Sequence, residues 1–237
     1  MGDVQQWKTA IECGGRVVVL ENTTSTQEAA LEQDLKVGDV CAAIHQSAGR
    51  GRGGNTWDSS GGIAVTVVLE KATPQLSIAV AAVLAENLQI LIPDHAIGIK
   101  WPNDLLVDER KLAGILIEQH NEICLVGIGV NVQKVEQAHA VSLHELGSTH
   151  ASSHVANVVV SSVFSANELD QVTATTSWLT RDVLVGTTQS FISDNKQVTG
   201  TVLNIDPMHS LVLETEAGVV TLHATTTTNI TTPARQS

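Results

Sequence analysis

The chain has 237 residues, 43% of them hydrophobic and 16% charged, which is enough for one large domain or for a domain with a small module. Its 13 Lys and Arg against 25 Asp and Glu give a net charge of -12, so the protein repels the phosphate backbone and nucleic acid is not an expected partner. No apolar run is long enough to span a membrane, no secretory signal is present and three scattered cysteines suggest no disulfide framework, so we expect a cytoplasmic protein.

Hydrophobic patterns in the first part of the chain predict strands and helices in alternation. RVVVLE (16–21) is typical of a strand, and the segment NTTSTQEAALEQDLK after it places Thr and Ser before a helix rich in Glu and Ala. DVCAAIHQ is a second strand that leads into a glycine-rich loop. The apolar, β-branched run GIAVTVVLE after the loop is typical of a buried strand. A long apolar helix then extends from Pro74 to about Pro93.

The pattern of predicted elements changes near Gly186. Before that point, four closely spaced strands are predicted within residues 97–132, and residues 155–185 are mainly helical. After it, short strands and turns at close spacing predict a small all-β barrel or sandwich. We therefore expect an α+β body in residues 1–185 and a β domain in residues 186–237.

The glycine-rich loop GRGRGGNTWDSSGG (49–62) fits the dinucleotide-binding spacing G-x-G-x-x-G at Gly49, Gly51 and Gly54. A strand follows these glycines instead of the helix whose N-terminus would hold a pyrophosphate, so a Rossmann turn is excluded. Two interpretations remain. The loop is an ordinary solvated connector, or it closes over an anion that Arg50 and Arg52 bind, in which case both arginines gain partners only when the anion is present.

A second cluster lies in KWPNDLLVDERKLAGILIE (100–118), where polar residues interrupt strands that should be apolar. Buried polar groups must be paired or functional, and a glycine inside a strand, here Gly114, indicates close approach by a ligand or a backbone. Alternatively, Asn103 and Asp104 only shape a turn after Pro102.

These two clusters, together with TSTQEAA (24–30) and GIGVNV (127–132), resemble the biotin protein ligase family over residues 17–131 in the correct order. The resemblance implies a catalytic domain built on a mixed sheet with flanking helices, related to class II aminoacyl-tRNA synthetases and lipoate ligases, followed by an SH3-like β-barrel. It implies a reaction in two steps. Biotin and MgATP form biotinyl-5'-AMP and pyrophosphate, and a lysine of the biotin carrier domain of a carboxylase then attacks the adenylate.

The resemblance also implies three groups of site residues, with no metal ligands assigned. The expected biotin-binding residues are Ser25, Thr26, Gln27, Gln46, Gly49, Arg50, Lys111 and Gly114. The expected ATP and adenylate contacts are Arg50, Arg52, Gly53, Asn55, Trp57, Asn103, Lys111 and Asn131. For catalysis, Lys111 bridges the biotin carboxylate and the α-phosphate, Arg52 clamps the phosphate, and Asp104 orients the acceptor lysine.

The chain departs from bacterial members of that family at Asn55 and Ser60, where they carry Arg and Pro. It also has no helix-turn-helix segment before Val17, so a repressor function is not expected, and we expect a monomer or weak dimer. Lipoate–protein ligase is an alternative, because residues 60–65 resemble a motif of that family and the chemistry is shared. A catalytically inactive biotin or nucleotide sensor is the other alternative, and it is disfavoured by the presence of both Arg52 and Lys111.

Overall fold

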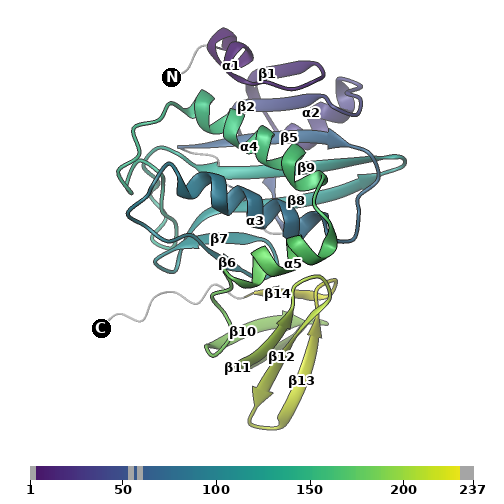
Figure 1. The fold of residues 1–237 in the computed structure, drawn as a ribbon, viewed down its shortest axis with the longest axis vertical. Coiled ribbons are helices and arrows are strands. Elements are labelled where there is room, and N and C mark those ends of the chain that lie inside the picture. The colour runs from purple at the N-terminus through teal and green to yellow at the C-terminus, as the bar shows by residue number, and fades with distance from the viewer. Residues whose placement is uncertain (1–3, 53–55, 58–60, 230–237) are drawn as a thin grey trace.

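The computed structural model describes residues 4–52, 56–57 and 61–229, and its largest element is a seven-stranded mixed sheet (Figure 1). The strand order is β1-β2-β5-β9-β8-β7-β6, in which β1 and β2 are parallel and every other neighbouring pair is antiparallel. Its strands are β1 (Val17–Thr23), β2 (Val40–Gln46), β5 (Gly62–Leu69), β6 (Gly98–Lys100), β7 (Asp104–Val107), β8 (Arg110–His120) and β9 (Ile123–Asn131). The mixed sheet expected from the sequence is confirmed.

Helices cover both faces of this sheet. The helices are α1 (Val4–Ala10), α2 (Thr26–Glu32), α3 (Leu76–Gln89), α4 (Ser152–Asn167) and α5 (Gln171–Leu179). Figure 1 shows α3 and α4 lying across one face, where they pack on each other and α4 contacts β5. Helix α2 contacts β2, β5 and β9. The strands and helices predicted from the sequence are confirmed, whereas α1 was not expected.

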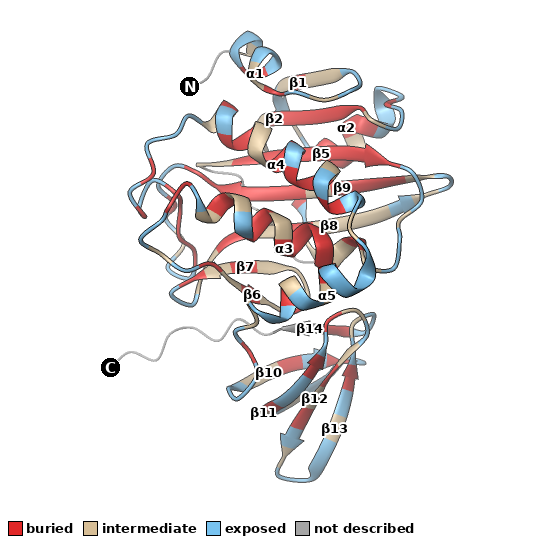
Figure 2. Cartoon of the chain, in the orientation of Figure 1, coloured by how far each residue is buried: buried red, intermediate tan, exposed pale blue. Residues whose placement is uncertain are grey.

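Successive side chains of the central strands point to opposite faces of the sheet. In β5, Val65 and Val67 belong to the main core under α3 and α4, whereas Val68 packs in a separate cluster with Ala29 and Ala30 of α2. Both faces of β5 are therefore covered, as its continuous apolar sequence predicts. Figure 2 shows that buried residues are concentrated in these central strands. The face that carries α2 is the one on which the site described below is built.

The C-terminal part of the chain forms a second, five-stranded antiparallel sheet of order β13-β12-β11-β10-β14. Its strands are β10 (Thr188–Ser193), β11 (Lys196–Asp206), β12 (Ser210–Thr215), β13 (Gly218–His223) and β14 (Thr227–Asn229). A small β domain is thus confirmed. Within the described residues β13 and β14 are the two edges and do not pair with each other, so the closed barrel stays a prediction.

The two sheets share one hydrophobic core. The indole nitrogen of Trp101 donates a hydrogen bond to the Pro207 carbonyl at 3.2 Å, and its ring meets the Phe191 ring edge-on at 6.4 Å between centroids. Both aromatic side chains are buried. The backbone N–H of Gly186 already bonds to Val202 of the second sheet, which supports our proposed boundary between residues 185 and 186.

We predict that Phe191→Ala destabilises the whole chain. Phe191 is fully buried where the sheets meet, and truncation of such a side chain typically costs about 3–5 kcal/mol of unfolding free energy. Because the core is shared, the loss should appear as a lower midpoint in one cooperative transition, measured by denaturant unfolding with far-ultraviolet circular dichroism.

Val219→Ala is the control, since Val219 lies on β13 and is 63% exposed, and its midpoint should stay within error of the parent. A separate early transition in Phe191→Ala, with the main transition unmoved, would show that the two sheets unfold independently.

Candidate functional site

A cleft with a volume of about 670 Å³ opens on the α2 face of the large sheet. Its floor comes from β8 and β9, one wall from α2 and β2, and another from the short antiparallel ribbon of β3 (Gly49–Arg50) and β4 (Thr56–Trp57). Ile192 and Thr227 of the C-terminal sheet also line it. The cleft therefore contains residues from both halves of the chain.

An irregularity in β8 places Lys111 and Gly114 in the same cleft. In a regular strand, residues three apart face opposite sides of the sheet. Here the register with β7 shifts between Leu105 and Leu106, so that Leu112 is an extra residue, and both Leu112 and its neighbour Ala113 point into the core. A Cβ on Gly114 would lie 3.2 Å from the Lys111 ammonium, which confirms that the two residues share a face. The bulge thus re-aims the lysine into the cleft.

The backbone of Lys111 is held from two sides. Its N–H donates to the His139 carbonyl at 2.8 Å and its carbonyl accepts from the Val141 N–H at 3.0 Å. The side-chain amide of Asn131 donates to the same carbonyl at 3.0 Å. Asn131, expected as a nucleotide contact, therefore also anchors the strand that carries the lysine.

The side chain of Lys111 forms an ion pair in the cleft. Its ammonium lies 2.7 Å from the Asp104 carboxylate and 5.5 Å from the centre of the Trp57 ring. Neither partner of the ion pair is fully buried, with side-chain exposures of 31% and 26%. An anionic ligand can therefore reach the ammonium from the cleft.

The indole of Trp57 lies against the glycines of β9. A Cβ on Gly129 would overlap the indole, so a residue with any side chain at this position would displace Trp57. The Trp57 ring nitrogen is buried and has no hydrogen-bond partner among the described residues. Trp57 as an ATP and adenylate contact remains a prediction, but the residue does line the cleft.

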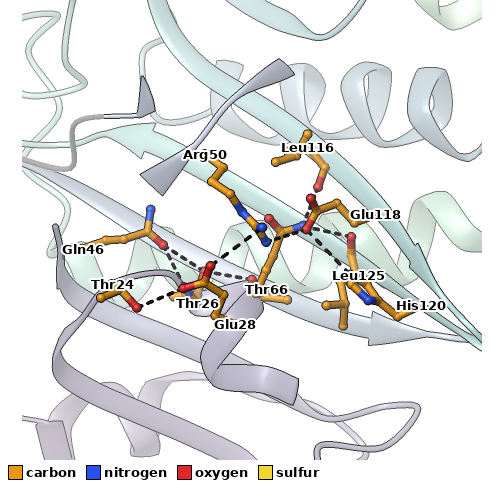
Figure 3. A network of polar contacts seen from close by, with 11 residues as sticks. Thr24, Thr26, Glu28, Gln46, Arg50, Thr66, Leu116, Glu118, His120 and Leu125 are labelled. Atoms are coloured by element: carbon orange, nitrogen blue, oxygen red, sulfur yellow. Dashed lines mark hydrogen bonds and ion pairs between the residues drawn. The ribbon is translucent and has the colours of Figure 1, made fainter. Parts of the chain in front are cut away.

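The other end of the cleft is polar and is anchored by α2 (Figure 3). The Gln46 carbonyl oxygen accepts from the Thr26 N–H at 2.8 Å and from the Thr26 hydroxyl at 3.3 Å. The Thr66 hydroxyl donates to the Thr26 hydroxyl at 2.8 Å. The amide nitrogen of Gln27 donates to the Leu116 and Leu125 carbonyls at 3.2 and 3.4 Å, so this residue ties α2 to the sheet.

Ser25 and Gly49 complete this polar end. Ser25 precedes α2, is 2% exposed and makes no side-chain capping bond, and it lines the cleft. Gly49 begins the β3–β4 ribbon, where a Cβ would overlap the side-chain amide of Gln46. The expected biotin-binding residues of α2, β2 and β3 are thus brought together.

The two arginines of the glycine-rich loop differ from the expectation that they gain partners only with an anion. The Arg50 guanidinium lies 2.8 Å from the Glu118 carboxylate and 3.8 Å from that of Glu28 (Figure 3). Arg52 donates to the Ala224 carbonyl, in the turn between β13 and β14 of the C-terminal domain. That expectation is wrong, because acidic and carbonyl groups of the chain already bind both side chains.

Among the described residues that line the cleft, the Lys, Arg, Asp and Glu side chains comprise four cations and one carboxylate: Arg50, Arg52, Lys100, Lys111 and Asp104. Burial lowers the pKa of Lys100 below its ordinary value, Asp104 opposes that shift and Lys111 adds to it. Burial also lowers the pKa of Arg52, again with Asp104 opposing. Because cations outnumber carboxylates among these side chains, the cleft is locally positive in an acidic protein. Such a cleft favours a ligand with more than one negative charge.

The remaining expected residues are placed as follows. Asn103 lines the cleft and donates its side-chain amide to the Ile115 carbonyl at 2.6 Å, which secures the edge of β8. Gly53 and Asn55 lie outside the described residues. Sequence reasoning missed Thr66, although a lone hydroxyl residue inside the apolar run GIAVTVVLE is a visible signal. It also missed Glu28 and Glu118, which no local pattern connects with Arg50.

Comparisons with known proteins identify relatives of this chain. It is 32% identical over 225 residues to the bifunctional ligase/repressor BirA of Escherichia coli. The aligned region covers 85% of this chain and 70% of that protein. It is 37% identical over 137 residues to the biotin--[acetyl-CoA-carboxylase] ligase of Paracoccus denitrificans, 52% of this chain and 57% of that protein.

A solved structure shares the fold. The biotin protein ligase from Aquifex aeolicus in complex with biotin and ATP superposes with a TM-score of 0.79 and 23% identity, over 91% of this chain and 98% of that one. Residues 15–134, which include the strands that form the floor of the cleft, match the model of one protein family. The chain belongs to the biotin/lipoate A/B protein ligase family.

Proposed function

We propose that this protein is an ATP-dependent biotin protein ligase that forms biotinyl-5'-AMP and transfers biotin to a lysine of a carboxylase carrier domain. The observation that carries the proposal is the polarity of one cleft. Fixed hydrogen-bonding groups come from Thr26 and Gln46, and the cations Lys100, Lys111 and Arg52 gather around Asp104 in the same cleft. A ligand with a polar neutral head and an anionic tail fits this distribution of groups. The names of the relatives, which are biotin ligases or a ligase/repressor, agree with such a ligand.

In the first step, a biotin carboxylate oxygen attacks the α-phosphorus of ATP. A new C–O–P linkage forms, the bond between the α- and β-phosphates breaks, and pyrophosphate leaves. Two anions must approach each other, so the barrier is lowered mainly by positioning and by neutralisation of charge. Lys111 is the side chain we assign to this task, since its ammonium is accessible from the cleft and its backbone is fixed on both sides.

Mg²⁺ belongs to the proposal as an ion that arrives with ATP. The described residues contain no group of three or more His, Cys, Asp or Glu side chains that could hold a metal by themselves. That composition suits Mg²⁺, which proteins usually bind through one or two carboxylates together with substrate phosphates. When bound, it would neutralise phosphate charge and orient the leaving pyrophosphate.

In the second step, the neutral amine of the acceptor lysine attacks the carbonyl carbon of the adenylate, and AMP leaves with the C–O bond electrons. We assign Asp104 to orient that amine, because its carboxylate lies in the cleft beside Lys111.

The protein would act in the cytoplasm as a monomer or weak dimer. Its three free cysteines fit a reducing compartment, its net charge argues against nucleic acid, and no described helix is long and apolar enough to cross a membrane.

We predict that the protein binds biotin and not lipoate. The ureido ring of biotin offers two donors and one acceptor that can use the Ser25, Thr26 and Gln46 groups, whereas the dithiolane ring of lipoate has no N–H donor and no strong acceptor for them. Isothermal titration calorimetry with each acid measures the difference. Equal affinity for the two acids would favour a lipoate ligase and contradict the proposal.

We predict that Lys111→Met slows adenylate formation by about 100-fold, equivalent to about 3 kcal/mol in the barrier, because a preorganised charge acts chiefly in the transition state. The measurement is the single-turnover rate of biotinyl-AMP formation from biotin and ATP. The affinity for biotin should fall less than the rate. Lys36→Met, at an exposed lysine paired only with exposed Asp34 in the described structure, is the control and should leave the rate unchanged. A normal rate in Lys111→Met would assign the task to another cation.

We predict that Arg52→Gly still forms the adenylate but releases it faster. If Arg52 clamps the phosphate from its position at the Ala224 carbonyl, its removal leaves the Thr26–Gln46 end intact. The released mixed anhydride should then label lysines of bystander proteins such as serum albumin. The test is the dissociation rate of biotinyl-AMP from parent and variant, and equal rates would show that Arg52 does not clamp the phosphate and serves only in contacts within the chain, such as that with Ala224.

A further inference from the structure

Lys100 is a half-buried lysine at the edge of the large sheet. It is the last residue of β6 and lines the cleft. Its neighbours Ile99 and Trp101 belong to the core, so alternation directs Lys100 to the opposite face, where the cleft lies. Backbone hydrogen bonds of Ile99 with Arg181 and Val183, at 2.7 and 3.3 Å, hold the strand in place. The lysine is therefore mounted on a well-anchored segment.

The ammonium of Lys100 differs from the other cations of the cleft in its partners. Arg50 and Arg52 bind groups of the chain, as described above. Lys111 lies 2.7 Å from the Asp104 carboxylate. Within the part of the chain that the structure describes, Lys100 forms no ion pair or side-chain hydrogen bond. Burial lowers its pKa, Asp104 opposes that shift and Lys111 adds to it. An anion supplied by a ligand would therefore stabilise its charged form.

The register of the sheet places Lys100 at the end of a row of paired residues on the cleft face. From β9 to β6, these residues are Gly129, Gly114, Asp104 and Lys100. Neighbouring strands are about 4.8 Å apart, so Lys100 starts about 10 Å beyond Gly114, on the side away from β2. In the order of the strands, Gln46 on β2 comes first, Lys111 on β8 follows, and Lys100 on β6 is last.

The chemistry of adenylate formation needs an anion-binding group on that side. The attacking oxygen, the α-phosphorus and the leaving oxygen lie roughly in line during the transfer. With the head of biotin near β2 and the α-phosphate at Lys111 on β8, the leaving group points toward β6. As the bond from the α-phosphorus to the bridging oxygen breaks, its electrons pass to that oxygen, so negative charge builds up on the pyrophosphate. A cation placed there lowers the barrier.

We propose that Lys100 is a further catalytic residue, which binds the pyrophosphate leaving group of ATP. The inference rests on the proposed function, since it adds a residue to the same reaction. Lys111 then serves the biotin carboxylate and the α-phosphate, and Lys100 serves the β- and γ-phosphates. Asp104 lies on β7, between the two strands that carry these lysines, so its carboxylate reduces the repulsion between their ammonium groups before ATP binds.

The experiment compares Lys100→Met, which removes the charge at similar length, with Lys100→Arg, which keeps a charge. Pyrophosphorolysis of bound biotinyl-AMP is followed as ATP formation over a range of pyrophosphate concentrations. We expect the half-saturating pyrophosphate concentration to rise about tenfold in Lys100→Met, because a hydrogen bond between two charged groups is lost. Lys100→Arg should recover most of this affinity, since a guanidinium also binds phosphate.

The affinity for biotinyl-AMP separates a contact with the leaving group from a general role in the cleft. The adenylate contains the α-phosphate but no pyrophosphate. Lys100→Met should therefore bind it with a dissociation constant close to that of the parent, measured by competition calorimetry, whereas Lys111→Met should bind it more weakly. Thermal unfolding checks that each variant folds, and Lys100→Gln replaces Lys100→Met if the latter does not.

Three results would overturn the inference. The first is an unchanged half-saturating pyrophosphate concentration in Lys100→Met. The second is a loss of affinity for biotinyl-AMP as large as the loss for pyrophosphate, because Lys100 would then serve the adenylate itself. The third is a Lys100→Arg variant that binds pyrophosphate no better than Lys100→Met.

The failure of the proposed function has a different signature. Parent protein that forms no biotinyl-AMP from biotin and ATP overturns both the function and the role of Lys100. Parent protein that forms the adenylate, combined with an unaltered Lys100→Met, overturns the role of Lys100 alone.

Discussion

The alternation of side chains across β5, β9 and β8 is the constraint on which the rest of the molecule depends. One face of these strands must be apolar to pack under α3 and α4, which leaves the other face to carry chemistry. On that second face, small and polar residues such as Thr66 and Gly129 lie next to α2 and the cleft. A shift of register by one residue would bury these groups in the core and remove the site.

The bulge in β8 extends this constraint to Lys111, the lysine to which we assign a role in adenylate formation. An unbroken strand that placed Gly114 on the cleft floor would turn Lys111 into the apolar core, where an ammonium would be costly. The extra residue at Leu112 resolves the conflict, since the apolar pair 112–113 stays in the core and Lys111 returns to the cleft. One bulge therefore keeps the core apolar and places the lysine in the cleft. The ladder hydrogen bonds that the bulge disrupts are offset by backbone bonds of Lys111 to His139 and Val141.

Much of the fold could be predicted from the sequence, but the bulge in β8 and the pairings between distant segments could not. Apolar and β-branched runs located the strands of the large sheet because their burial on both faces leaves a strong pattern, and a recognisable family resemblance grouped the site residues. Pairings between distant segments leave no such trace. Arg50 with Glu118, and Arg52 with the Ala224 carbonyl, join residues 68 and 172 positions apart. Short, weakly patterned elements such as α1 and the β3–β4 ribbon were missed for the same reason.

The contact of Arg52 with Ala224 gives the small C-terminal sheet a place in the chemistry of the cleft. The guanidinium of Arg52 has five N–H donors, so by our proposal it can turn donors to a phosphate from its position at this carbonyl, in the turn between β13 and β14. A neutral carbonyl is the weaker partner for a guanidinium, because a charged acceptor forms the stronger hydrogen bond. The carbonyl can therefore keep Arg52 near the cleft without competing strongly with an anionic ligand. With Ile192 and Thr227 in the wall, the second sheet completes the site from the side that the large sheet leaves open.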